Sequence, residues 1–550
     1  MVKKTLVGLG ALALVAAGPV PHAGATAPAS PVKVEPAQRG HGPSHRGVVI
    51  QRKRKMPKFA RLTRTKAAGE HLLQATVLDR KGATATSDEV DGLRIWPLNG
   101  GDPSFVDVVN GHAEGSLPPG DYTINAIVKT PEPDGTTSTS LIYLPKVTVA
   151  GDVSLTLDAR KANPVHVEVD KAGAKPAGTV VWVSQRIGGV FRDVTEIDGD
   201  HLYVTPAAED GGVEYELQSL LTQDGKTKDS PYSYNVARKA AGIPTDPNLS
   251  ARTKDLAAVQ TGYAGEGKPA CAQEEAGVDF GSSAIAIFNT ETGGLPATRT
   301  EYYTPGFDWD LTGLITTSDC DFENGNEDAQ FRNERFPKAG TYTRSWNKGP
   351  LGPADGELVL DTGDGTGYDA AMLSGTDGVS NVGGYSFMKG DSALVSLSGE
   401  SIGQSIVPGY GAIWARPAPG RYTLTTNATR SAPWSDLATS QHVVWDVTVG
   451  QDNVIKLPTV QYRTALDDTN QARANTTQTL TVVPQQAKAG VEPSLWTSFD
   501  DGKSWTPVSL RADGDQWVAS FRNPAKGFVS LRTKIDGAVD QTVIRAYGIR

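Results

Sequence analysis

The sequence predicts an all-β protein built of several tandem immunoglobulin-like or fibronectin-like β-sandwich domains. The first observation is the alternation of apolar and polar residues, seen most plainly in residues 495–499, 516–521 and 527–533. Successive side chains of a strand point to opposite faces of a sheet, so alternation indicates strands with one buried face. The second observation is Asp501-Gly502, which separates two alternating runs and favours the tight turn of an antiparallel hairpin.

Length and composition agree with this fold class. A chain of 550 residues is too long for a single core and predicts roughly three to five domains. Glycine (60) and proline (35) are abundant and mean hydropathy is −0.32, as expected for many short strands separated by turns. The net charge of −9 argues against a nucleic acid as partner.

The first 25 residues have the pattern of a secretory signal peptide. Lys3 and Lys4 precede an apolar run at residues 6–17, and the small residues 23–25 offer a cleavage site. The run is too short for a transmembrane segment, which needs about 20 apolar residues, and no later stretch is long enough either. We therefore expect a secreted, extracellular protein.

Residues 26–68 carry a dense run of basic side chains, including residues 52–55 and Lys58. Like charges at this density repel one another and resist packing, which predicts a flexible arm. Two alternatives are an electrostatic tether to an anionic cell-wall polymer and a protease-sensitive junction.

The strand-rich remainder divides where the alternation lapses. The predicted units are a β-sandwich at 69–160, a β-rich domain at 161–250, a larger β-sandwich region at 255–458 and a C-terminal β-sandwich at 459–550. Residues 255–260 fit either a short helical turn or an edge strand. Tyr122, Tyr342 and Tyr422 each follow a proline- and glycine-bearing turn. Such a tyrosine can return its hydroxyl to the backbone at a sheet corner, which indicates at least three sandwich units.

Cys271 and Cys320 are the two cysteines of the chain. In an exported protein they are expected to form a disulfide, which would close a loop of about fifty residues and contribute roughly 4 kcal/mol on the chain-entropy account. A metal site or a reactive thiol is the alternative, but there is no Cys-x-x-Cys and no histidine between the pair.

Catalytic residues are not evident in the sequence. Nucleophilic hydrolysis needs a serine or cysteine beside a histidine that an acid orients. His41 and His45 lie in the basic arm, and the strand position of His442 favours a structural role. Residues 384–388 come nearest to a nucleophile elbow around Ser386, but they lack its closing glycine and its helix. We predict no catalytic residue, no cofactor and no enzymatic activity.

Two places could bind something without catalysis. The loop at 318–328 holds five oxygen-bearing candidates for calcium, which takes six to eight oxygen ligands: Asp319, Asp321, Glu323, Asn324 and Asp328. Their spacing is not that of an EF-hand, so a solvated acidic loop is the first interpretation and a structural calcium the alternative. Trp434 lies beside Pro433 in a loop and is the candidate for surface contact with a sugar or a partner chain.

Several segments, in order, resemble the C-terminal accessory region of large secreted bacterial subtilisin-like serine proteases. They are residues 155–165, Thr341-Tyr342 through Trp346-Asn347 to Pro353, Arg421-Tyr422-Thr423-Leu424, Phe499-Asp500-Asp501-Gly502-Lys503-Ser504-Trp505, and residues 529–532 with 542–548. The resemblance covers roughly residues 70 to 550 and implies β-rich modules associated with a protease. The family's catalytic Gly-Thr-Ser is absent and the only His-Gly is His41-Gly42 in the arm, so no catalytic residue is carried over.

Together these observations predict a secreted, non-catalytic multi-sandwich protein that binds or scaffolds extracellular protein or cell-wall material. One alternative is a protease-associated accessory protein, a partner of a subtilisin-like protease or split from a catalytic chain. The other is a structural surface spacer.

Overall fold

The computed structural model describes residues 48–51, 59–62, 68–208, 211–282, 284–322, 327–354, 356–360, 366–370, 372–376, 381–413, 417–488 and 490–550. The predicted signal peptide lies outside these residues. The described chain is built of strands, with two short 3-10 turns, η1 (Ala159–Lys161) and η2 (Thr253–Asp255). The predicted all-β fold is therefore confirmed. No helix in the described ranges is long and apolar enough to cross a membrane.

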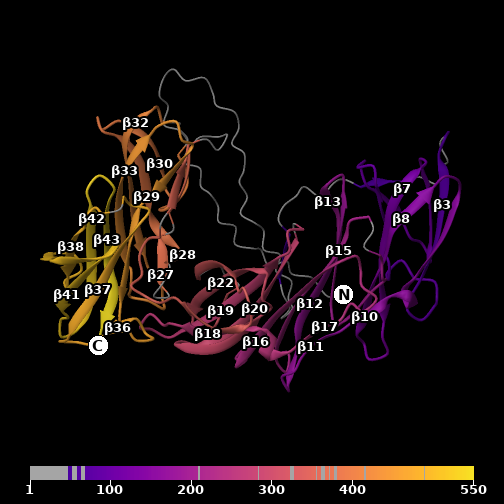
Figure 1. Ribbon diagram of the computed structural model, residues 1–550, viewed down its shortest axis with the longest axis horizontal. Coiled ribbons are helices and arrows are strands. Elements are labelled where there is room, and N and C mark those ends of the chain that lie inside the picture. Colours follow the sequence, from indigo (N-terminus) through magenta and orange to yellow (C-terminus); the bar gives the residue numbers. More distant parts are fainter. Residues whose placement is uncertain are drawn as a thin grey trace, which may run out of the picture.

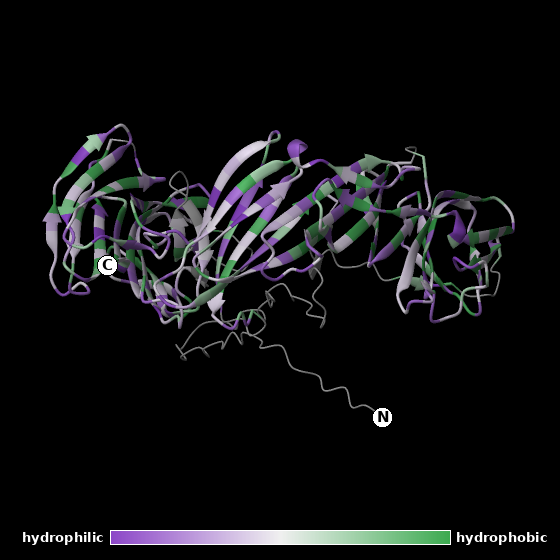
Figure 2. Cartoon of the chain, turned by 90° about the horizontal axis from the view of Figure 1, so that it is seen from below, coloured by the Kyte–Doolittle hydropathy of each residue, from purple (hydrophilic) through white to green (hydrophobic). Residues whose placement is uncertain are grey.

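Three units follow one another along a curved, elongated molecule, from the indigo strands on the right of Figure 1 to the yellow strands on the left. Apolar and polar residues alternate along the strands (Figure 2), so each sheet has a face to bury. The N-terminal unit packs a sheet of order β10-β14-β8-β7-β4-β5-β2 against the sheet β6-β3-β9, around Leu73, Ile95 and Ile124. Its strands are β2 (Ala60–Arg61), β3 (His71–Leu78), β4 (Gly92–Pro97), β5 (Ser104–Asp107), β6 (His112–Leu117), β7 (Gly120–Pro131), β8 (Thr137–Val149), β9 (Val153–Asp158), β10 (Asn163–Val165) and β14 (His201–Val204).

The middle unit is a sandwich of two sheets, and its core includes Trp182, Phe288 and Trp309. One sheet has the order β13-β12-β15-β16-β21-β18-β24 and the other β1-β20-β19-β22-β23-β28-β27, while β11 and β17 form a small parallel pair. The strands are β1 (Val48–Gln51), β11 (Val167–Val169), β12 (Ala174–Ile187), β13 (Val190–Asp198), β15 (Val213–Gln223), β16 (Tyr232–Ala241), β17 (Leu249–Ala251), β18 (Ala257–Tyr263), β19 (Ala270–Asp279), β20 (Ala284–Gly294), β21 (Ala297–Tyr303), β22 (Asp308–Thr317), β23 (Asp328–Arg335), β24 (Gly340–Trp346), β27 (Leu373–Thr376) and β28 (Asn381–Tyr385).

The C-terminal unit has three sheets around one core that includes Leu424, Trp445 and Val543. Their orders are β31-β26-β25-β34, β35-β37-β41-β40 and β30-β29-β32-β33-β43-β42-β38-β39, with β36 pairing β43. The strands are β25 (Gly356–Val359), β26 (Thr366–Ala370), β29 (Met388–Ser396), β30 (Ser401–Ser405), β31 (Tyr410–Ile413), β32 (Gly420–Arg430), β33 (Ser440–Val449), β34 (Val454–Leu457), β35 (Thr459–Thr464), β36 (Gln471–Ala472), β37 (Thr477–Gln485), β38 (Ser494–Ser498), β39 (Thr506–Val508), β40 (Leu510–Asp513), β41 (Gln516–Arg522), β42 (Gly527–Ile535) and β43 (Val539–Ile549).

The sheets cross all three boundaries predicted between the strand-rich units. Strand β14 pairs in parallel with β8 across residue 160, β16 pairs in parallel with β21 across residues 250–255, and β33 pairs with β43 across residue 458. The predicted region 255–458 is instead shared between the middle and C-terminal units. A lapse in alternation marks a turn, but it does not reveal which distant strands pair after that turn.

Other local predictions can be compared directly. The hydroxyls of Tyr122, Tyr342 and Tyr422 each donate to the carbonyl four residues earlier, at 2.9, 2.9 and 2.7 Å, which confirms the three tyrosine corners. Asp501 and Gly502 have φ of 58° and 81° and lie in the loop that joins the antiparallel strands β38 and β39, which confirms the hairpin, although the loop spans residues 499–505 rather than a tight two-residue turn.

Two other local predictions differ from the structure. After the turn η2, β18 pairs on both sides, with β21 and β24, so it is an interior strand rather than an edge. The predicted arm contains β1 and β2, which pair with β20 and β5. The strand pairing of these residues supplies backbone hydrogen bonds that the arm's charge density does not reveal.

Candidate functional site

Most of the residues singled out from the sequence lie around one hollow at the junction of the middle and C-terminal units. The hollow has a volume of about 330 Å³ and is lined from three stretches of the chain, the end of β22 with the start of β23, the link between β28 and β29, and the loop after β32. Its lining residues are Thr316, Thr317, Asp321, Asp328, Ser386, Phe387, Ser431, Ala432, Pro433 and Trp434.

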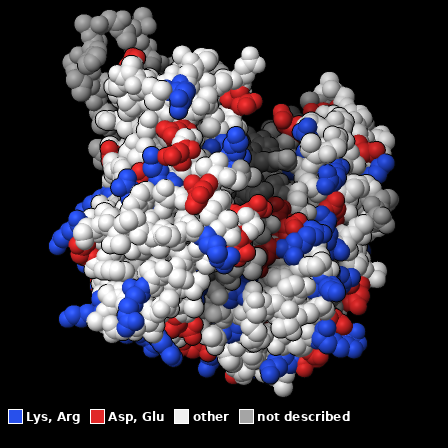
Figure 3. Space-filling model, turned by 60° about the vertical axis from the view of Figure 1, so that its left-hand side comes forward, with Lys and Arg blue, Asp and Glu red and all other residues white. Residues whose placement is uncertain are grey.

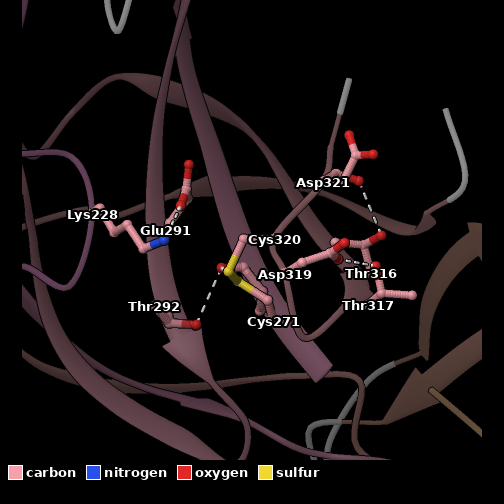
Figure 4. Close-up of a disulfide and its surroundings, with 10 residues drawn as sticks. Lys228, Cys271, Glu291, Thr292, Thr316, Thr317, Asp319, Cys320 and Asp321 are labelled. Carbon is pink, nitrogen blue, oxygen red and sulfur yellow. Dashed lines mark hydrogen bonds and ion pairs between the residues drawn. A yellow bond between two sulfur atoms is a disulfide. The ribbon is translucent and has the colours of Figure 1, made fainter. Parts of the chain in front are cut away.

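The predicted disulfide forms beside this hollow. Cys271 lies on β19 and Cys320 in the turn after β22, with their Cα atoms 5.2 Å apart and their sulfurs bonded (Figure 4). The bond fastens the turn that carries Asp319 and Asp321 to the neighbouring strand. The Asp319 carboxylate accepts a hydrogen bond from the Thr317 hydroxyl, which lowers the pKa of Asp319.

Of the five calcium candidates, Glu323 and Asn324 lie outside the described residues. The three that are described, Asp319, Asp321 and Asp328, do not form a group of ligands within reach of one ion. Asp328 is buried, and its carboxylate bonds to Arg430 and, at 2.9 Å, to the indole N–H of Trp434. Among described residues, the group of metal-ligating type within ligand distance is Cys271, Glu291 and Cys320, and both thiols are already bonded to each other. The Asp328 carboxylate therefore belongs to an ion pair within the protein and does not act as a calcium ligand together with the acidic loop.

Trp434 is buried, with 4% of its surface exposed, which corrects the prediction of a surface contact. Its ring packs against Ala270 and Ile315 at the end of the middle sheet. The loop that carries it is exposed at Ser431 and Pro433, but the indole fills the space beneath. A loop position alone does not predict exposure, because large aromatic rings gain most from burial.

Arg430, which the sequence reasoning missed, holds the two units together from the last position of β32. Its guanidinium bonds to Glu266 at 2.8 Å, to the Ser435 hydroxyl at 2.9 Å and to Asp328. Burial opposes its charge, but the carboxylates of Glu266 and Asp328 outweigh this and raise the pKa of Arg430. The sequence did carry a signal for this role. Every second residue of β32 from Tyr422 onward is buried, and Arg430 occupies the last of these buried positions.

Further polar contacts cross the same junction. The Asn470 amide donates to the carbonyls of Gly265, at 3.1 Å, and Asn347, at 2.8 Å. Lys348 donates to the carbonyl of Asp467 at 2.8 Å. The two units are thus joined by directional bonds as well as by packing.

A second polar cluster, also missed, lies inside the middle sandwich. Arg344 bonds to Glu274 at 2.9 Å and to Glu301, and Arg299 bonds to Glu301 at 2.8 Å. These four side chains are at most 2% exposed. The hydroxyls of Tyr263 and Tyr303 and the indole N–H of Trp346 also donate hydrogen bonds to the two carboxylates. The sequence signal for this cluster was a pair of charged residues two positions apart, Arg299 and Glu301, on the face of a strand that points into the core.

The two carboxyls of this cluster respond differently to burial. Burial raises the pKa of Glu274 to about 7. The positive charge of Arg344 opposes this rise, and the negative charge of Glu301 adds to it. Burial would also raise the pKa of Glu301, but the guanidiniums of Arg344 and Arg299 outweigh it and lower the pKa of Glu301 to about 2. A perturbed carboxyl is often catalytic, but these groups are enclosed in the core and do not face the hollow.

Six of the ten described residues that line the hollow carry a hydroxyl or a carboxylate. Its lining offers hydroxyls, carboxylates and one exposed ring, and none of the ten described lining residues is a histidine, cysteine, lysine or arginine. The Ser386 hydroxyl accepts a hydrogen bond from Arg430 at 3.3 Å, and a guanidinium cannot serve as a general base. The link after Ser386 leads into β29 rather than a helix. His442 instead bonds to Asn427 at 2.7 Å.

No family model matches this chain, and no curated protein matches it. Among solved structures it is similar to the Bacillus anthracis TIE protein, with 12% identity and a TM-score of 0.11 over 66% of this chain and 64% of that one. It is also similar to the T6 backbone pilin of serotype M6 Streptococcus pyogenes, with 9% identity and a TM-score of 0.12 over 88% and 97% of the two chains. A third is the pilus adhesin SpaC from Lactobacillus rhamnosus GG, with 10% identity and a TM-score of 0.09 over 79% and 57%. Similarities of this size carry no argument about function.

Proposed function

We propose that this protein is an extracellular, non-catalytic binding protein, and that it holds extracellular protein or cell-wall material at the hollow between its middle and C-terminal units. The observation that carries the proposal is the hollow's composition. It joins an exposed phenylalanine to hydroxyl and carboxylate groups, and it lies over a buried frame made by Arg430, Asp328 and Trp434. Concave sites with one apolar surface and a few fixed polar groups are the usual places where proteins bind ligands.

Retention from culture medium and cell-wall preparations tests the binding role. The purified full chain, immobilised, is expected to retain a protein or a wall polymer. If it retains neither, the protein is a spacer and the proposal fails. The resemblance to protease accessory regions makes a subtilisin-like protease one protein to include in this experiment.

The non-catalytic part is tested separately with a fluorophosphonate probe, which labels activated serines. We expect no labelling of the full chain, because the Ser386 hydroxyl bonds to a guanidinium instead of a base. Labelling that disappears in Ser386→Ala would identify a hydrolase and overturn this part of the proposal.

A further inference from the structure

We propose that the hollow binds a neutral polysaccharide, with Phe387 packed against the face of a sugar ring and the surrounding hydroxyl and carboxylate groups bonded to sugar hydroxyls. This inference rests on the proposed binding function and names the chemistry of its ligand. It is carried by three features of the described residues: exposed aromatic rings, the charge of the lining and a rigid floor.

The aromatic rings form the first feature. Phe387 is 46% exposed although it lines the hollow. On the adjoining strands, Tyr385 and Phe331 are 41% and 46% exposed, and their ring centroids are 5.6 Å apart. Their closeness follows from the pairing of β28 with β23, which puts Tyr385 opposite Ala329, two residues from Phe331. Large apolar side chains that gather on a surface mark interaction sites.

Aromatic rings of this kind suit sugars in particular. One face of a pyranose ring carries mainly C–H groups, which pack on the face of an aromatic side chain, while its hydroxyls point outward around the ring. Residues placed beside the ring must then offer hydrogen bonds. Thr317, Asp321, Ser386 and Ser431 supply hydroxyl and carboxylate oxygens around Phe387.

The charge of the lining selects among polysaccharides. Two carboxylates line the hollow and no cationic side chain is among its described lining residues. Arg430 bonds to Asp328 from below, and Asp321 is the second carboxylate of the lining. Figure 3 shows acidic and basic side chains close together on one face of the molecule, near a place where the surface is hollowed between two lobes. Without a cation among these described residues, the lining offers no ionic partner to phosphate-bearing or carboxylate-bearing polymers, while its oxygens can bond to the hydroxyls of neutral ones.

The floor of the hollow is rigid before any ligand arrives. Trp434 and Asp328 are locked by Arg430, and the disulfide of Cys320 fixes the turn before Asp321. A prearranged site loses less conformational entropy on binding. The volume of about 330 Å³ lies at the lower end of the range for ligand sites and accommodates roughly one or two sugar rings.

Co-sedimentation of the full chain with insoluble glycans tests the proposal. The neutral probes are cellulose and chitin, and the competitors are soluble teichoic acid and a lysine-rich peptide. We expect sedimentation with at least one neutral glycan, undisturbed by either competitor. Phe387→Ala should weaken binding about tenfold, consistent with about 1.4 kcal/mol for one lost stacking contact.

The matched control is Phe499→Ala, since Phe499 is 42% exposed in the same unit but does not line the hollow. Its binding should equal that of the unaltered chain. Equal binding by Phe387→Ala would overturn the inference and place any ligand elsewhere. Retention of a protein or of teichoic acid without any neutral glycan would also overturn it, while leaving the proposed binding function intact.

A small internal cavity lies beneath the hollow. Asp328, Gln330 and Asn347 line it, each at least 94% buried, and each has one polar atom without a protein partner in the described chain: Asp328 Oδ1, Gln330 Nε2 and Asn347 Oδ1. The Gln330 oxygen accepts from the Asn347 backbone at 2.7 Å, so its amide nitrogen is the free donor. The Asn347 nitrogen donates to Glu266 at 2.7 Å, so its oxygen is a free acceptor.

We infer that one ordered water molecule binds there. Its two hydrogens would be donated to the two free acceptors, and one of its two lone pairs would accept from the free donor. The cavity has room for about one water, and buried waters typically make about three hydrogen bonds. Gln330 Nε2, a donor, excludes a cation. A high-resolution crystal structure should show a single density peak within hydrogen-bond distance of the three atoms, lost in Gln330→Met. An empty cavity, or a peak with metal-like short contacts, would overturn this.

Discussion

The two junctions of the molecule are built differently. Where the N-terminal unit meets the middle unit, the contact is mainly apolar, with Leu141, Leu202 and Val204 packed against Val181 and Leu217. A buried polar side chain there, the neutral Gln185, bonds to Thr123 and Tyr143. Where the middle unit meets the C-terminal unit, the contact is centred on the buried charges of Arg430, Glu266 and Asp328.

The two junctions differ in how strictly each one fixes the relative orientation of the units that it joins. Apolar packing is roughly proportional to area and has no direction, so most of the contact at the first junction does not by itself fix the orientation of the two units. A buried guanidinium must meet its acceptors at fixed angles, so the second junction sets one arrangement of its units. It is the second junction that leaves a hollow with polar walls.

The largest effect should come from Arg430→Met. This change leaves Glu266 and Asp328 buried without their cation, and breaking a buried pair in this way costs about 3–5 kcal/mol. Urea denaturation measures the loss. Arg421→Met, at an exposed position of the same strand, is the control and should change stability by less than about 0.5 kcal/mol. A loss no larger than the control's would mean that the charges do not hold this junction.

The apolar junction should respond to Leu202→Ala. Deleting this buried side chain leaves a cavity and should cost about 3 kcal/mol in urea denaturation. Because the site of the change is remote from the hollow, ligand retention should stay unaltered, in contrast to Arg430→Met. A binding defect in Leu202→Ala would show that the two junctions are coupled.

The pH dependence of stability should come from the ionic cluster between the junctions. Glu274 has a pKa of about 7 in the fold against an ordinary value of 4.5, so its contribution is present below about 4.5 and is lost as pH rises toward 7. Glu301, with a pKa of about 2, contributes above about 4.5 and loses this as pH falls toward 2. Stability from this cluster is therefore greatest near pH 4.5 to 5.

Glu274→Gln should abolish the loss between pH 5 and 7, an effect on the order of 1 to 3 kcal/mol. The measurement is the urea midpoint at a series of pH values. Glu400→Gln, at an exposed position, is the control and should keep the slope of the unaltered protein. A slope that persists in Glu274→Gln would locate the titrating group elsewhere.

The smallest effects should come from the tyrosine corners. Tyr122→Phe, Tyr342→Phe and Tyr422→Phe each remove one hydroxyl-to-carbonyl bond, worth about 1 kcal/mol. Each corner lies in a different unit, so hydrogen exchange should show reduced protection in that unit alone. Loss of protection on both sides of a junction would mean that the joined units open together.

Sequence reasoning succeeded where the cause is local. The fold class, the turn at Asp501-Gly502 and the three tyrosine corners follow from residues within a few positions of one another. The disulfide followed from the presence of two cysteines in a chain expected to be exported.

It failed where distant strands decide the outcome. The pairing of β16 with β21 and of β33 with β43 joins segments that alternation cannot match to each other, so the predicted unit boundaries were misplaced. For the same reason Trp434 and Asp328 were interpreted separately, as a surface ring and a metal ligand, although Trp434 bonds to Asp328, which in turn bonds to Arg430.

Strand β33 has one neighbour that directly precedes it, β32, and another, β43, that the chain supplies only after residues 450–538 have been made. Until then β33 presents a long unpaired edge with Val443 and Trp445 beside it. Unpaired edges recruit strands from other chains during folding. Biosynthesis of this protein therefore includes an interval in which a nearby nascent copy competes with its own final strand, and factors that shield that edge should govern its yield.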